Sequence, residues 1–169
     1  MRTSRPDIMK RVYEPDAPAF DAALEGVLDD AFGPGRHAKV SARVREFARL
    51  DRALSRVALE DSAPVGCCRI YRIAIDQAPA LFLGPLAVRR DRQGEDIGSA
   101  LIAAALGACD AAGDAPILVV GQPALFAPFG FVEVPRGTVI LPGPIEARRL
   151  QYRGPTAPAG VVRAPRDAS

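Results

Sequence analysis

The sequence predicts one α/β domain with a mixed, mostly antiparallel sheet that helices flank. At 169 residues, of which 49% are hydrophobic, the chain is long enough for one domain with a substantial core. Residues 15–50 place apolar side chains at helical spacing, whereas residues 54–88 alternate or run continuously apolar, as strands do. A strongly apolar helical segment then separates two apolar runs, which predicts a βαβ unit with two parallel strands.

The N-terminal part of the chain is expected to form one strand and two helices. Residues 8–14 are typical of a short strand. A helix follows over residues 15–33, with Asp16 as a candidate N-cap and a Gly-Pro-Gly sequence at its end. Residues 39–50 carry a second apolar stripe at helical spacing, with arginines on the opposite face.

Three consecutive antiparallel strands with short connections are expected next, over residues 54–60, 65–76 and 80–88. The third strand contains Gly84 and Pro85. Because proline cannot donate a hydrogen bond to a neighbouring strand, this pair predicts a bulge or a place where the sheet splays open.

The most regular helix is predicted over residues 96–113 and ends at a glycine. Residues 116–121 form a short buried strand parallel to the strand before that helix, and one or two helical turns then lead to a strand that starts at Phe131. The predicted domain therefore spans residues 1–153. Residues 154–169, rich in Pro, Ala and Gly, are expected to be a loose tail.

Composition narrows the class of function. The chain has 22 basic and 20 acidic residues, so its net charge of +2 gives no argument for nucleic acid or an acidic membrane as partner. No apolar segment approaches the ~20 residues of a membrane span, and the N-terminus lacks the apolar core of a signal peptide, so we expect a cytoplasmic protein. Cys67, Cys68 and Cys109 have neither metal-site spacing nor a disulfide pattern, so we expect reduced thiols and no metal.

The strongest candidate for a binding site is the segment AVRRDRQGEDIGSALI, residues 87–102. Three arginines precede a turn that contains Gln93, Gly94 and Gly98, and a helix begins directly after it. A helix N-terminus behind such a turn presents unpaired backbone N–H groups and a partial positive charge, which suits a phosphate. The same residues also allow a plain connection in which Asp96 is an ordinary N-cap. These residues alone leave both interpretations open.

The order LFLGPLAVRRDRQGEDIGSALIAAALGACDAAG, followed by ILVVGQPALFAPFGF, resembles the GNAT superfamily of acyl-CoA-dependent N-acyltransferases, in particular a branch of small bacterial members. The resemblance is close over residues 81–131 and looser before and after them. It implies a sheet splayed open at its middle. The pantetheine arm of an acyl-CoA would then lie between the strand that ends at Val88 and the strand at residues 117–121.

The resemblance also implies which residues contact the acyl-CoA. Backbone groups of Leu86, Ala87 and Val88 would bond the acyl carbonyl and the pantetheine amides. Main-chain N–H groups would surround the pyrophosphate, contributed by Gln93, Gly94, Glu95, Asp96, Ile97, Gly98 and Ser99. Phe126, at the position of a family tyrosine, belongs to the same candidate site.

Two residues depart from the family pattern. Asp96 replaces the first glycine of the motif and adds a negative charge near the expected pyrophosphate. At an effective dielectric of 20, two unit charges about 4 Å apart repel by roughly 4 kcal/mol. The second departure is Leu125-Phe126 in place of a tyrosine pair whose hydroxyl often protonates the departing thiolate. Loss of such a general acid typically costs about 10²- to 10⁴-fold in rate. Packing on the core is the alternative role for Phe126 and Phe129.

The other candidates have ordinary structural explanations, and no catalytic residue is assigned. Cys67 and Cys68 are adjacent on a predicted strand, so they would face opposite sides as small buried hydrophobes. His37, the only histidine, suits a surface or capping role. Arg69 and Tyr71 alternate on the strand and could face the acceptor, although packing on the sheet explains Tyr71 equally well.

The leading interpretation is an enzyme that transfers an acyl group, most simply acetyl, from CoA to the amine of a small molecule or a protein. The amine would attack the thioester directly in a ternary complex. A GNAT-fold protein that has lost efficient catalysis and works as an acyl-CoA-binding or regulatory module is the alternative. A nucleotide-binding domain of Rossmann type is a third interpretation, which the antiparallel strands oppose. An exposed edge in the last strands is compatible with a homodimer.

Overall fold

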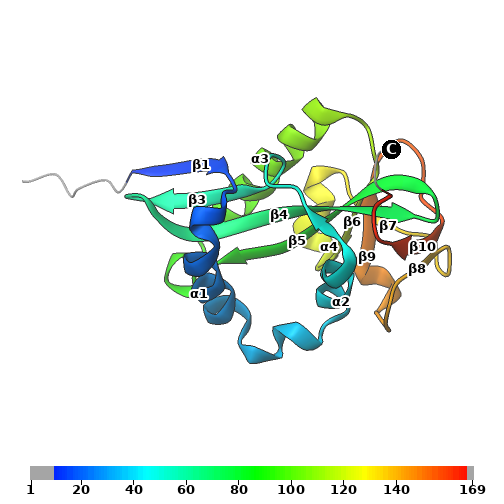
Figure 1. Cartoon of the computed structure of the whole chain (residues 1–169), viewed down its shortest axis with the longest axis horizontal. Coiled ribbons are helices and arrows are strands. Elements are labelled where there is room, and N and C mark those ends of the chain that lie inside the picture. The colour runs from blue at the N-terminus through cyan, green and yellow to red at the C-terminus, as the bar shows by residue number, and fades with distance from the viewer. Residues whose placement is uncertain (1–9, 167–169) are drawn as a thin grey trace, which may run out of the picture.

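The computed structural model describes residues 10–166 and shows an open, twisted sheet with helices on both faces (Figure 1). The strands lie in the order β1-β3-β4-β5-β6-β9-β7. In chain order these are β1 (Arg11–Pro15), β3 (Arg56–Glu60), β4 (Ala63–Ile75), β5 (Ala78–Val88), β6 (Ile117–Val120), β7 (Val132–Glu133) and β9 (Leu150–Arg153). Three short strands join them from outside this path: β2 (Arg49–Leu50) and β10 (Gly160–Arg163) pair with β4, and β8 (Val139–Ile140) pairs with β10.

The predicted fold class is confirmed, since β3, β4 and β5 pair antiparallel and β6 is parallel to β5. The crossover between β5 and β6 contains the 3-10 turn η3 (Arg90–Arg92) and the 16-residue helix α3 (Ile97–Ala112), which ends at Gly113 as expected. Strands β4 and β5 are long apolar runs, and burial on both faces favours such runs.

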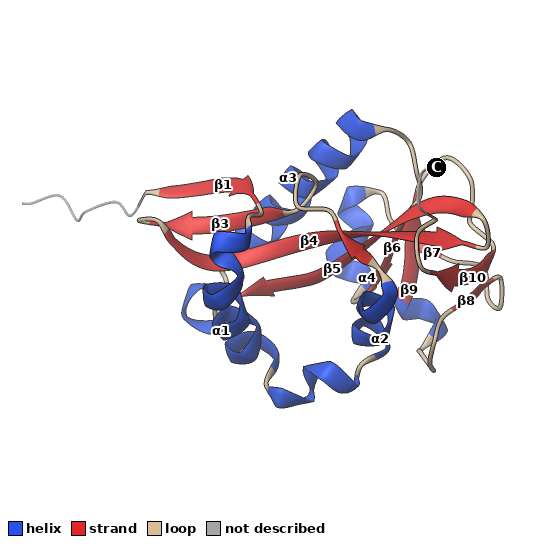
Figure 2. Cartoon of the chain, in the orientation of Figure 1, coloured by secondary structure: helices blue, strands red, loops and turns tan. Residues whose placement is uncertain are grey.

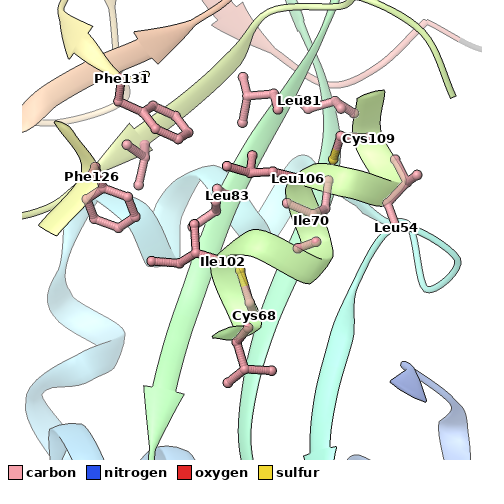
Figure 3. Packing of buried hydrophobic residues seen from close by; sticks show 14 of the residues in the cluster. Leu54, Cys68, Ile70, Leu81, Leu83, Ile102, Leu106, Cys109, Phe126 and Phe131 are labelled. Atoms are coloured by element: carbon pink, nitrogen blue, oxygen red, sulfur yellow. The ribbon is translucent and has the colours of Figure 1, made fainter. Parts of the chain in front are cut away.

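Helices cover both faces of the central strands (Figure 2). One face packs against α3, in a cluster that includes Cys68, Ile70 and Leu83 (Figure 3). The other face packs against α1 (Asp21–Phe32) in a cluster that contains Cys67, and a third cluster lies beneath α2 (Val40–Phe47). Adjacent residues of a strand point to opposite faces, so Cys67 and Cys68 separate as expected.

Several boundaries differ from the expectation. The first helix begins with the 3-10 turn η1 (Pro18–Phe20), and the N-cap of α1 is Phe20. The N-cap prediction for Asp16 is therefore wrong. Its carboxylate accepts hydrogen bonds from Arg69 Nε at 2.8 Å and from Arg52 Nη1 at 3.1 Å. Two guanidiniums neutralise a buried carboxylate and donate charge-assisted hydrogen bonds to it, whereas a backbone N–H supplies no counter-charge.

The second helix is shorter than predicted, because Arg49 and Leu50 leave it to pair with Arg72 and Tyr71 of β4. The first strand starts at Arg11, and the predicted Ile8 and Met9 lie outside the described residues.

The expectation of a loose tail is also wrong for the described part of it. Val162 and Arg163 of β10 pair with Ile75 and Ala74, which places residues 160–163 in the sheet. Ladder pairing and burial of Val162 outweigh the weak strand preference of a Pro- and Gly-rich sequence.

The connection after β6 contains α4 (Pro123–Phe126) and the 3-10 turn η4 (Ala127–Phe129), followed by β7. Two further 3-10 turns border the region described below. They are η2 (Pro34–Ala38), between α1 and α2, and η5 (Ala147–Arg149), directly before β9.

Candidate functional site

The sheet opens where β5 and β6 separate. These parallel strands pair only from Leu81 to Leu83 on β5 and from Ile117 to Val119 on β6. Beyond Leu83, β5 continues along β4 as far as Val88, after a register shift opposite Gly84 and Pro85. Residues 86–88 therefore have a partner strand on one edge, and residues 84–88 have none on the edge that faces β6 in the described structure. The splayed sheet and the irregularity at Gly84-Pro85 are both as predicted.

Hydrogen bonds show which way the backbone of this edge points. The N–H of Arg89 donates to Val65 on the β4 side at 2.8 Å. Backbone groups of successive strand residues point to alternate edges, so the groups of Val88 point away from β4. The Val88 carbonyl accepts a hydrogen bond from Gln93 Nε2 at 3.2 Å. The predicted Gln93 thus connects the end of β5 to the turn before α3.

A cleft of about 560 Å³ occupies the opening between the strands. Gly84, Pro85 and Leu86 line it from β5, and Val119, Val120 and Gly121 line it from β6 and its end. Residues of α1 and α2, the turns η2 and η5 and the end of α4 complete its walls. Its volume lies in the range of small-molecule sites.

The turn before α3 has the geometry that a glycine motif provides. Gly94 has φ 85°, and Asp96 has φ 60° and ψ 17°, in the left-handed region. The first intrahelical bond runs from Ala100 N–H to the Asp96 carbonyl at 3.1 Å, so the N–H groups of Ile97, Gly98 and Ser99 have no acceptor within the helix. The Asp96 side chain is exposed and forms no capping hydrogen bond. A bulky residue would strain this position, whereas Asp tolerates it.

The comparisons with known proteins agree with this geometry. A family model described as an acetyltransferase (GNAT) domain matches residues 51–133, which contain β3 to β7, the splayed edge and the turn. The chain belongs to the GNAT superfamily.

Solved structures of GNAT proteins share the fold over nearly the whole chain. A GNAT family N-acetyltransferase (YhbS) from Escherichia coli, in complex with CoA, superposes with a TM-score of 0.75 at 19% identity and covers 95% of this chain and 92% of its own. A GNAT family acetyltransferase from Brucella melitensis, in complex with acetyl-CoA, gives a TM-score of 0.68 at 25% identity, with 92% and 96% covered. The search of curated proteins gave no match.

In this GNAT domain, two of the three arginines that precede the turn are engaged by carboxylates. Arg89 Nε lies 2.7 Å from Asp91, and Arg92 Nε lies 2.6 Å from Glu60. Glu95 accepts a hydrogen bond from Arg11 at 3.1 Å. The carboxylate of Glu95 is therefore offset by an arginine. The structure records no such partner for Asp96 among residues 10–166.

Phe126 belongs to the core and also borders the cleft. Its side chain is only 3% exposed, and its ring meets that of Phe131 edge to face at a centroid distance of 5.6 Å (Figure 3). A Cβ on Gly121 would lie 2.5 Å from the Phe126 ring, so this glycine gives the ring its space. The core-packing role is confirmed. A phenylalanine supplies no hydroxyl at this corner of the cleft.

The remaining sequence candidates lie outside the cleft. All three cysteines are buried, and burial raises the pKa of Cys67 to about 12 and that of Cys109 to about 11. Arg69 is buried in ion pairs with Asp16 and Asp21 and does not line the cleft. His37 is exposed on η2 and is likewise absent from the cleft wall.

Tyr71 also lies outside the cleft, packed against the cluster beneath α2. Burial raises the pKa of its hydroxyl. The structure thus favours the packing explanation of Tyr71.

Sequence reasoning missed two residues of the cleft. Arg45 of α2 and Arg149 of η5 line it from segments about 100 positions apart. Each looked like one more arginine on a solvated face in an Arg-rich chain. The one available signal was the segment around Arg149, which lies in the looser part of the family resemblance.

Two further features bear on partners. None of the helices within residues 10–166 combines the length and apolar character that a membrane span needs. Over the same residues, His, Cys, Asp and Glu side chains do not gather in groups of three that could hold a metal ion.

Proposed function

We propose that this GNAT protein transfers an acyl group, most simply acetyl, from CoA to a primary amine by direct attack in a ternary complex. The observation that carries the proposal is the open edge of β5, which lines a cleft of small-molecule size at residues 84–86 and continues through Val88 to the turn before α3. The Escherichia coli and Brucella melitensis proteins, which share this fold, are described in complex with CoA and acetyl-CoA.

The residues present fit such a donor. Backbone groups of Leu86 and Val88 point to the edge that β6 leaves open and would bond the pantetheine amides and the acyl carbonyl there, whereas those of the predicted Ala87 point to β4. At the other end, the N–H groups of Ile97, Gly98 and Ser99 have no intrahelical acceptor and suit a pyrophosphate. The turn from Gln93 to Asp96 would wrap around that anion, and Phe126 would border the acyl end.

Acetyl-CoA would supply the acyl group as a thioester, and the chain would supply position and polarisation. The acceptor nitrogen attacks the carbonyl carbon, so an N–C bond forms, the C–S bond breaks and CoA leaves as a thiolate. The amine loses one proton to water. Fixed backbone N–H groups at the acyl oxygen stabilise the charge that develops there, and the cleft walls hold the nitrogen in line.

The thiolate would be protonated from solvent, because Phe126 offers no proton. We therefore expect a rate about 10²- to 10⁴-fold below that of a relative with a hydroxyl at this place. The same observation supports the second candidate function. A protein that binds acyl-CoA without efficient transfer would also tolerate a phenylalanine here and a carboxylate at Asp96.

A binding titration and an activity assay decide between these functions. Acetyl-CoA and CoA are titrated into the protein by calorimetry, and release of free thiol is then followed with a panel of primary amines. Binding with thiol release that depends on the amine supports the transferase. Binding without thiol release supports the binding module. No heat with either ligand at millimolar concentration would refute both.

Three expectations from the sequence stay predictions: a domain that ends at residue 153, a cytoplasmic location and a homodimer. Deletion of residues 154–169 tests the first. Because β10 pairs with β4, we expect this deletion to lower the melting temperature, a result that would extend the domain beyond residue 153.

A further inference from the structure

The cleft has an excess of positive charge. Five basic residues line it, Arg36, Lys39, Arg43, Arg45 and Arg149, whereas Glu146 is the only acidic residue among the described residues of its wall. The Glu146 carboxylate is already engaged by Arg148 at 3.0 Å. A cationic wall attracts anions, and its partial burial makes that attraction stronger than at an open surface.

Three of the five cations have partners. Arg36 lies between Glu25, at 2.5 Å, and Asp29, at 3.1 Å. The ammonium of Lys39 sits 5.3 Å from the centre of the Phe32 ring. Arg43 donates a hydrogen bond to the carbonyl of Pro142 at 3.3 Å.

Arg45 and Arg149 are different. Within residues 10–166, the structure records no hydrogen bond or ion pair for either guanidinium, and Nε of Arg149 is fully buried without an acceptor. Burial lowers the pKa of Arg45, and the nearby Arg36 and Arg69 lower it further. Arginine nevertheless stays charged in proteins, so each side chain holds a cation that lacks a counter-ion.

These two arginines flank the opening between the strands. Nη1 of Arg45 lies 3.9 Å from the position that a Cβ on Gly84 would take, at the start of the open edge of β5. Arg149 is joined to the end of β6, because its carbonyl accepts the N–H of Gly121 at 3.0 Å. Both residues therefore line the cleft beside the open edge of β5, where an acceptor would meet the acyl group.

We propose that Arg45 and Arg149 recognise a carboxylate of the acceptor, which makes the substrate class small amines that carry a carboxylate. This inference rests on the proposed function, since it names the acceptor of that same site. A guanidinium pairs with a carboxylate through two parallel N–H···O bonds, and the bound carboxylate would supply the acceptor that buried Nε of Arg149 lacks. The cleft volume of about 560 Å³ favours a small molecule over a protein chain.

The test compares matched amines. Thiol release from acetyl-CoA is measured with ω-amino acids from glycine to 6-aminohexanoate and with n-alkylamines of the same length. We expect the best ω-amino acid to exceed its matched alkylamine about 10- to 100-fold in kcat/KM, the effect of charge-assisted hydrogen bonds. Arg45→Gln and Arg149→Gln should bring that ratio close to 1, and Arg45→Lys should restore part of it.

Arg136→Gln is the matched control. It removes the same charge from an exposed position on the loop between β7 and β8, outside the cleft, and should leave the ratio unchanged. Circular dichroism melting establishes that each variant is folded. A wild-type protein that uses alkylamines as well as ω-amino acids, or a ratio that survives both glutamine substitutions, would overturn the inference while the transferase function stands. A preference for phosphoethanolamine over every carboxylate would also overturn it.

Binding gives a second readout that does not depend on turnover. If no amine releases thiol, the proposed transfer fails, and glutarate is titrated into the wild type and Arg45→Gln by calorimetry in the presence of CoA. Binding that weakens about tenfold or more in the variant supports a carboxylate site between the two arginines. Absent binding, or equal binding by both proteins, contradicts it.

Discussion

Replacing Asp96 tests whether the turn before α3 holds a pyrophosphate. The Asp96 carboxylate is exposed, and its backbone takes the left-handed conformation at φ 60°. At about 4 Å from a bound phosphate charge, Coulomb repulsion amounts to roughly 4 kcal/mol at an effective dielectric of 20 and roughly 1 kcal/mol in water. Because the side chain points to solvent, the smaller figure applies. Asp96→Asn should then tighten acetyl-CoA binding about fivefold.

Asp96→Gly separates charge from backbone strain. Asp96→Asn removes the charge and keeps a residue that tolerates the left-handed region, whereas glycine removes the charge and also the Cβ. The turn is left-handed before any ligand binds, so relief of strain raises the stability of the free protein and does little for affinity. We expect both variants to bind acetyl-CoA equally tightly, with Asp96→Gly the more stable by up to about 1 kcal/mol.

Calorimetry at low and high salt is the assay, with thermal melting beside it. The affinity gain should shrink at about 1 M salt, where the Debye length is about 3 Å. Asp114→Asn is the control, because it makes the same charge change at the other end of the 16-residue α3, about 24 Å away. Equal affinity of wild type and Asp96→Asn at low salt, within twofold, would refute a pyrophosphate in this turn.

Three further substitutions test the supports of the site. Asp16→Asn should destabilise the fold by about 3–5 kcal/mol in chemical denaturation, because it leaves buried Arg69 without its fully buried carboxylate partner. Gly121→Ala should cost about 1–3 kcal/mol, since its Cβ would meet the Phe126 ring at 2.5 Å. Hydrogen bonds from Arg11 and Arg92 hold the pKa of Glu60 below its ordinary value of 4.5. The free energy of unfolding of the wild type should therefore fall as the pH drops below 4.5. Glu60→Gln should lose that part of the pH dependence.

The first two substitutions have matched controls at exposed positions. For Asp16, the exposed Asp114→Asn, whose carboxylate has no recorded hydrogen bond within residues 10–166, should change stability by less than about 0.5 kcal/mol. For Gly121, Gly107→Ala on the exposed face of α3 meets nothing within 4 Å and should be neutral or stabilising. A Glu60→Gln protein that still loses stability in parallel with the wild type from pH 5 to pH 3 would contradict the ion-pair argument.

Local patterns in the sequence were sufficient for most elements. The long apolar runs of β4 and β5, the 16 residues of α3 and the glycine that ends it follow from periodicity and capping, which depend on neighbours a few residues away. Failures came where distant residues competed for the same groups. Arg52 and Arg69 take the Asp16 carboxylate from the helix end, and β4 draws Arg49 and Leu50 out of the second helix.

The sequence by itself determined the fold class, the family and the place of the turn before α3, because a strand, a glycine turn and a helix form one continuous segment. Only the tertiary structure decided the rest of the site. The open edge of β5 exists because β6 pairs with no more than three of its residues, and the cleft acquires its charge because α2 and η5 bring Arg45 and Arg149 to that opening. Contacts between segments about 100 positions apart depend on packing, which no local pattern records.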